Sequence, residues 1–172
     1  IMTTISANLQ AVLARIGEAA RNCGRQPEEI ALLAVSKTWP GSFVLEAARA
    51  GQKAFGENYV QEGVDKVHET ALSDLDWHFI GPLQSNKTRP VAEAFQWFHS
   101  VDRFKIAERL SQQRPAHLPP LQICLQVNIS NEDSKSGVPE EDVASLAQQI
   151  ARLPHLKLRG LMTIPAPASE FA

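Results

Sequence analysis

The chain has 172 residues, 44% of them hydrophobic and 21% charged, which is typical of a single globular domain with a sizeable core. Its 17 basic and 19 acidic side chains leave a formal net charge of −2 at pH 7, so no positive field draws nucleic acid to it. No apolar stretch approaches the roughly 20 residues of a membrane span, the start lacks a signal-peptide pattern, and we expect one cytoplasmic domain over residues 1–172.

Segments with helical and extended patterns alternate along the sequence. Apolar residues spaced by three and four between residues 5 and 20 predict an amphipathic helix, and the apolar run at 30–35 predicts a strand covered on both faces. Five further strands are predicted, at 53–55, 76–80, 96–101, 121–129 and 156–162. Helices are predicted between them, at 43–50, from Glu57 onward, at 86–95, around 106–110 and at 140–151.

This alternation is typical of a parallel α/β sheet. Six strand units with right-handed crossovers fit either a doubly wound open sheet or most of an eight-stranded barrel. The sequence contains neither GxGxxG nor GxxxxGK[ST], so the common nucleotide-binding forms of the open sheet lose their usual support. The pattern alone does not choose between the two architectures.

Lys37 follows the first predicted strand closely and is the most informative polar residue. Reactive groups in parallel sheets and barrels come from the carboxyl ends of strands. An amine there is expected near a low-dielectric interior, where its pKa falls and the neutral form can build a Schiff base with an aldehyde such as pyridoxal phosphate (PLP). A snorkelling lysine or a strand-end ion pair is the alternative, which position alone favours.

Two other polar residues occupy informative places. His78 lies within the third predicted strand, where alternation directs it away from the face of its neighbours; it is either a structural histidine bonded to backbone, which is the usual case, or a cofactor contact. Asn58 stands where the second strand turns into a helix, and helix capping is favoured over ligand contact. The remaining histidines and the cysteines Cys23 and Cys124 show no metal-ligand spacing, so no metal site is expected.

Seven segments together resemble one known family, the pyridoxal phosphate homeostasis proteins. They are LLAVSKTWP at 32–40, AGQKAFGENYVQEGVDK at 50–66, WHFIGPLQSNKTR at 77–89, HSVDR at 99–103, LQVNIS at 125–130, SKSGV at 134–138 and LRGLMTIPAP at 158–167. Each segment alone is weakly specific, but the ordered series runs along the whole chain and is highly specific.

The resemblance implies a (β/α)8 TIM-type barrel like the N-terminal domain of alanine racemase, with an extra N-terminal helix and PLP held as a Schiff base on Lys37. It reverses the preference for a structural lysine, and it also puts Asn58, His78 and Met162 at or near the cofactor pocket. Members of the family are regarded as buffering or delivering PLP without catalytic turnover. The implied partners are PLP and PLP-dependent apoenzymes, and the implied state is a monomer.

Two alternatives to this function remain open at the level of sequence. One is a PLP-dependent amino-acid racemase or decarboxylase, although such an enzyme needs an acid or base opposite the lysine and a means of closing over its substrate. The other is a nucleotide- or sugar-phosphate-binding α/β enzyme in which Lys37 contacts phosphate or acts as a catalytic base. Family members continue through two more strand units that grip the phosphate, so we expect the domain to be C-terminally incomplete, with the last two βα units absent from this sequence.

Overall fold

The computed structural model describes residues 4–72, 74–130 and 136–165. It divides into two compact units, one ending at Trp77 and the other beginning at His78. Parts of two segments that carry the family resemblance, residues 134–135 and 166–167, lie outside the described residues. Among the described helices, none is both long and apolar enough to cross a membrane.

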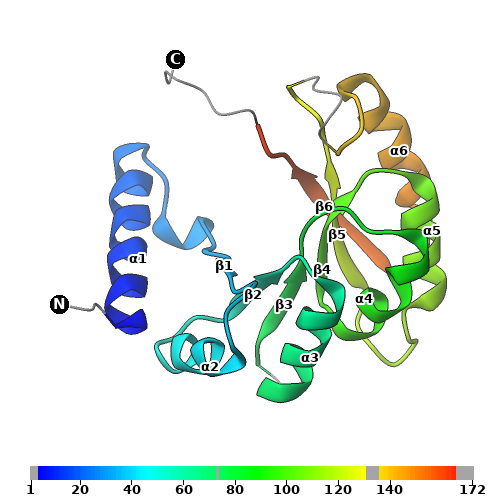
Figure 1. The fold of residues 1–172 in the computed structure, drawn as a ribbon. Coiled ribbons are helices and arrows are strands. Elements are labelled where there is room, and N and C mark those ends of the chain that lie inside the picture. Colours follow the sequence, from blue (N-terminus) through cyan, green and yellow to red (C-terminus); the bar gives the residue numbers. More distant parts are fainter. Residues whose placement is uncertain (1–3, 73, 131–135, 166–172) are drawn as a thin grey trace. The chain divides into compact units, whose positions relative to one another are not determined.

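The first unit combines helices with a short parallel strand pair (Figure 1). Its elements are α1 (Ile5–Asn22), the 3-10 turn η1 (Pro27–Glu29), β1 (Ala34–Val35), α2 (Gly41–Arg49), β2 (Ala54–Glu57) and α3 (Val60–Thr70). The Thr4 hydroxyl caps α1 by accepting from the Ala7 N–H at 3.2 Å, which satisfies one of the free donors of the first turn. Gly24, with φ of +69°, follows the helix in a left-handed conformation that glycine adopts readily.

Two boundaries predicted in this unit are wrong, one because of a local turn and the other because of tertiary contacts. The first strand contains only Ala34 and Val35, because the Ile30 N–H donates to the Pro27 carbonyl of the preceding 3-10 turn instead of a neighbouring strand. Glu57 ends β2 rather than beginning a helix, and α3 starts only at Val60. The buried Glu57 carboxylate is bonded by two other segments of the unit, which keeps its backbone extended.

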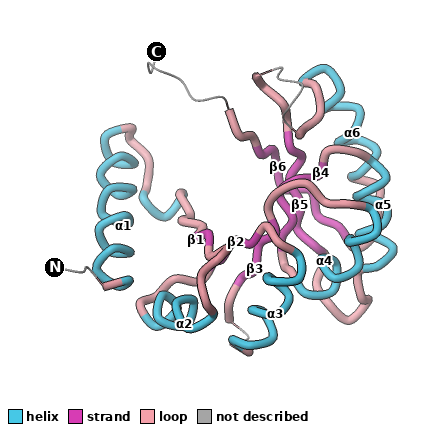
Figure 2. The backbone as a smooth tube through the Cα atoms, in the orientation of Figure 1, coloured by secondary structure: helices cyan, strands magenta, loops and turns pink. Residues whose placement is uncertain are grey.

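The second unit is a parallel sheet with helices on one side (Figure 2). Its elements are β3 (Asp76–Phe79), which begins in the first unit, η2 (Ser85–Lys87), α4 (Thr88–Ala94), β4 (Trp97–Val101), α5 (Phe104–Gln113), β5 (Leu121–Gln126), η3 (Glu140–Asp142), α6 (Val143–Ile150) and β6 (Leu156–Met162). The strands β3, β4, β5 and β6 pair in parallel and in sequence order. The prediction for β6 has the observed bounds, whereas β5 ends three residues earlier than predicted.

The core of the second unit lies between these strands and their helices. The Phe79 ring packs 5.4 Å from that of Phe95 and 5.9 Å from that of Phe98. Burying each large apolar side chain contributes about 1.5–3 kcal/mol, and the fully buried set extends through both layers, with Ile106, Leu110, Leu121, Ile123, Leu125 and Ile150. The opposite face of the strands carries partly exposed polar and aromatic residues, among them Trp97, His99 and Gln122.

Candidate functional site

Lys37 and Asn58 lie at the same edge of the β1–β2 pair. Val35 pairs with Gly56, and the Ser36 N–H donates to the Gly56 carbonyl at 2.9 Å. Lys37 and Asn58 follow directly, at the carboxyl ends of two neighbouring parallel strands. The Ser36 hydroxyl donates to Glu57 at 2.6 Å, and Lys37 lies in the turn that directly follows.

The Lys37 side chain is exposed. The prediction that Lys37 lies in a low-dielectric surrounding is therefore wrong for the described part of the chain, because the turn that carries it is open to solvent. The structural alternative of a strand-end ion pair also fails, since no carboxylate among the described residues lies within bridging distance of this ammonium. Lys37 is thus an accessible amine without a charged partner in the described part of the chain.

Asn58 does not cap the following helix. The residue at the N-cap of α3 is Tyr59, and it makes no side-chain capping bond. The Oδ1 atom of Asn58 is buried and has no hydrogen-bond partner among the described residues. Since buried acceptors are almost always paired, this oxygen is suited to accept from a bound molecule at the strand ends.

His78 belongs to an aromatic and imidazole cluster on the open face of the second unit. Its Nδ1 lies 2.8 Å from Nε2 of His99, and its ring stacks on Trp97 with a centroid distance of 5.2 Å and an interplanar angle of 9°. Burial, followed by the neighbouring His99, lowers the pKa of His78 to about 3, and burial also lowers the pKa of His99. The pair is neutral at pH 7.

The expected hydrogen bond from His78 to backbone is wrong, because its ring nitrogen pairs with another imidazole. Sequence reasoning excluded a metal site at His99 but missed its role as the partner of His78. Alternation along β4 could have indicated this pairing, because His99 lies two residues after Trp97 and shares its face of the strand. Trp97 is the register partner of His78 on β3. The guanidinium of Arg159, on β6, lies 5.8 Å from the Trp97 ring centroid and extends the cluster across the sheet.

Met162 is half-buried at the carboxyl end of β6. Its carbonyl accepts from the Val127 N–H at 2.9 Å, and its side chain lines a surface pocket with Ile129 and Leu161. Strands β4 and β5 separate it from His78. The structure therefore brings Lys37 and Asn58 together in the first unit, but His78 and Met162 are not neighbours within the second.

The chain is similar to known proteins over nearly all of its length. The family model for the alanine racemase N-terminal domain matches residues 7–172. The Pyridoxal phosphate homeostasis protein of Pseudomonas aeruginosa is 60% identical over 171 residues, which are 99% of this chain and 74% of the relative. The protein of the same name from Escherichia coli K12 is 58% identical over 173 residues, again 99% and 74% of the two chains.

Solved structures give the same result for the fold. The PLP-bound structure of PipY from Synechococcus elongatus is 38% identical, with a TM-score of 0.76 over 91% of this chain and 73% of that one. The alanine racemase of E. faecalis, at 16% identity, has a TM-score of 0.63 over 88% and 41%, a likeness of fold alone. These matches confirm the predicted fold class, a TIM-type barrel like the N-terminal domain of alanine racemase, rather than the open doubly wound sheet. The chain belongs to the alanine racemase N-terminal domain family and, within it, to the pyridoxal phosphate homeostasis proteins.

Proposed function

We propose that this protein binds PLP covalently through the amine of Lys37 and holds or delivers it in the cell without turnover of its own. The observation that carries the proposal is an accessible amine at the carboxyl end of β1, beside the strand end where Asn58 lies. Among the described residues this amine has no charged partner and Asn58 Oδ1 has no donor. The PLP-bound relative and the relatives named as homeostasis proteins support it.

The residues at these strand ends fit the chemistry of PLP. The cofactor supplies an electrophilic aldehyde carbon, which a neutral lysine amine attacks. Its pyridine nitrogen, when protonated, is a donor that would suit the buried Asn58 Oδ1, which has no partner in the described residues. We also propose His78 and Met162 as cofactor contacts, the first as a neutral polar ring and the second as a soft apolar side chain.

The absence of turnover is part of the proposal. An enzyme of this kind needs a second acid or base opposite the lysine. Tyr59, the single tyrosine of the sequence, is 56% exposed at the start of α3, a position poorly suited to proton transfer in a dry site. The curated relatives carry names of homeostasis proteins rather than of enzymes.

We also propose that PLP-dependent apoenzymes receive the cofactor and that the protein acts as a cytoplasmic monomer. Both cysteines are free thiols, Cys23 exposed and Cys124 partly buried, and unpaired thiols suit a reducing compartment. Size-exclusion chromatography with light scattering tests the monomer, and transfer of PLP to a chosen apoenzyme, followed by recovery of that enzyme's activity, tests delivery.

The central test is chemical. Incubation with PLP, borohydride reduction and peptide mass mapping should place one covalent adduct on Lys37, with the visible absorbance of bound PLP before reduction. Lys37→Ala should abolish both signals, whereas Lys53→Ala, which removes another exposed lysine of the same unit, should change neither. A colourless protein, or an adduct spread over surface lysines, contradicts the proposal. Racemisation or decarboxylation of an amino acid that disappears in Lys37→Ala would point instead to a PLP enzyme.

A further inference from the structure

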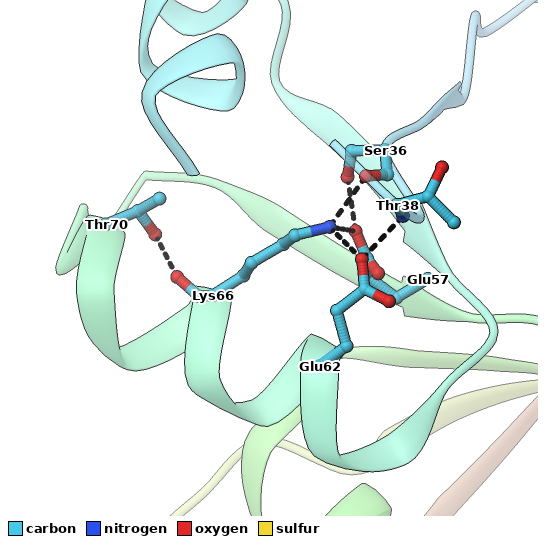
Figure 3. Close-up of polar contacts among 6 residues, drawn as sticks. All are labelled: Ser36, Thr38, Glu57, Glu62, Lys66 and Thr70. Carbon is cyan, nitrogen blue, oxygen red and sulfur yellow. Dashed lines mark hydrogen bonds and ion pairs between the residues drawn. The ribbon is translucent and has the colours of Figure 1, made fainter. Parts of the chain in front are cut away.

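Charged side chains of α3 hold the backbone on both sides of Lys37 (Figure 3). The Lys66 ammonium donates to the carbonyl of Ser36 at 2.6 Å. The Glu62 carboxylate accepts from the N–H of Thr38 at 2.5 Å. The residues before and after Lys37 are therefore each bonded to an ionised group, and such bonds are about twice as strong as those between neutral groups.

These two side chains form one network with Glu57, in which Lys66 and Glu57 are buried and Glu62 is partly exposed. Lys66 Nζ lies 2.7 Å from Glu62 Oε1 and 2.8 Å from Glu57 Oε1, and the Ser36 hydroxyl donates to the same Glu57 oxygen at 2.6 Å. The side chains of Lys66 and Glu57 are 5% and 0% exposed. The hydrogen bond from Lys66 lowers the pKa of Glu62, so Glu62 is ionised at neutral pH and keeps accepting from the backbone.

Stability alone is a weak explanation for this network. Replacing a buried ion pair by apolar side chains of similar volume is often neutral or stabilising, because both charges must be stripped of water. A geometric role accounts for the network better, since its bonds converge on the two neighbours of the reactive lysine. Lys66 and Glu62 lie one helical turn apart on α3, which places both on the same face of that helix.

The backbone that they hold is a strained turn. The Trp39 N–H donates to the Ser36 carbonyl at 3.1 Å, which closes a four-residue turn with Lys37 in its second position. Thr38, in the third position, has φ of +66°, a left-handed conformation that β-branched residues disfavour. Such conformations persist where surrounding contacts over-determine them, and here the bonds from Lys66 and Glu62 supply those contacts.

We propose that Lys66 and Glu62 are positioning residues that fix the direction in which Lys37 leaves β1 and so set the efficiency of covalent PLP capture. This inference rests on the proposed function of Lys37. In capture, the amine nitrogen bonds to the aldehyde carbon, a C=N bond replaces C=O, and the carbonyl oxygen leaves as water with the two amine protons. The nitrogen must approach to roughly 3–3.5 Å in the correct orientation, and a displacement of about 1 Å can lower the rate about a hundredfold.

The test compares Lys66→Met with Lys53→Met in the purified protein. Lys53 pairs with Asp74 in the same unit, with side chains 55% and 61% exposed, so the control removes the same charge from an exposed pair that does not contact the turn. Two ligands are measured. PLP reports covalent capture through its absorbance and its borohydride-fixed fraction, and pyridoxine 5′-phosphate, which has no aldehyde, reports noncovalent affinity.

Lys66→Met should reduce the rate of PLP capture by about tenfold to a hundredfold while the affinity for pyridoxine 5′-phosphate stays within about twofold. The Lys53→Met control should match the unaltered protein for both ligands. Unchanged capture in folded Lys66→Met overturns the inference, and so does an equal loss for both ligands, which would mean a general disruption of the site.

Glu62→Ala decides the question if Lys66→Met does not fold. It removes the bond to the Thr38 N–H but leaves Lys66 paired with Glu57, so no buried charge loses its partner. Capture should again fall by about tenfold or more with analogue affinity retained, and a normal capture rate would refute the inference. If the unaltered protein itself captures no PLP, the proposed function of Lys37 fails instead, so the two failures are distinguishable.

Discussion

Lowering the pH from 7 to 5 should destabilise the ligand-free protein through His78. Burial lowers the pKa of this imidazole from 6.5 to about 3 in the folded state. Above pH 6.5 His78 is neutral in both the folded and the unfolded chain, and its contribution does not change with pH. Below that value the unfolded chain takes up a proton that the folded chain excludes until about pH 3, so acid favours unfolding across this window.

The size of the effect follows from the shift. In this window the free energy of unfolding falls by about 1.4 kcal/mol for each pH unit, since one more proton is bound in the unfolded state. Over the roughly 1.5 units between pH 6.5 and 5 the loss is about 2 kcal/mol. The pKa of His99 is also lowered by burial, so its contribution has the same sign and adds to the loss.

Urea unfolding followed by circular dichroism at pH 7 and pH 5 measures this difference. His78→Gln has no titrating group at this position, so its fall in free energy of unfolding between the two pH values should be smaller than that of the unaltered protein by about 2 kcal/mol. His117 is exposed, and His117→Gln should retain the full fall. Equal pH dependence in the unaltered protein and in His78→Gln would refute the assignment of the lowered pKa.

Three further substitutions have distinct expected results. Asn58→Ala removes a buried oxygen that has no partner in the described residues, so the urea midpoint of unfolding should stay the same or rise while the PLP affinity measured by titration falls. A fall in both quantities would contradict the proposal that this oxygen contacts the cofactor. Gly137→Ala should lower the free energy of unfolding by about 2 kcal/mol or more, because φ is +132° and an added Cβ would lie 2.7 Å from the backbone nitrogen of Asn128. Calorimetry that shows no change would exclude this strain. Arg114→Met removes bonds from a buried guanidinium to the carbonyls of Ala92 at 2.8 Å and Phe95 at 2.7 Å. The free energy of unfolding measured by calorimetry should fall by about 3 kcal/mol, and a fall below about 1 kcal/mol would show that water replaces these bonds.

Local periodicity in the sequence was sufficient to predict the order of most helices and strands, whereas the choice of a barrel came from the family resemblance. Spacing by three and four identified α1, the strand predicted at 156–162 has the observed bounds of β6, and the repeated strand-helix order identified a parallel sheet. The ordered motifs identified the family, and the resemblance, rather than position alone, made Lys37 the candidate for the cofactor amine, a role that stays a prediction. These features are properties of neighbouring residues, which the chain displays before it folds.

Only the tertiary structure decided how the polar residues of the site are used. The sequence assigned Glu57 to a helix start and Asn58 to a cap. In the fold, Glu57 is the buried partner of Lys66, and Asn58 Oδ1 has no donor within the part of the chain that the structure describes. It likewise paired His78 with His99 and left Lys37 exposed. Hydrogen-bond partners and burial depend on segments that lie 9 to 30 residues apart in the Lys66 network, and no local pattern encodes which of them will meet.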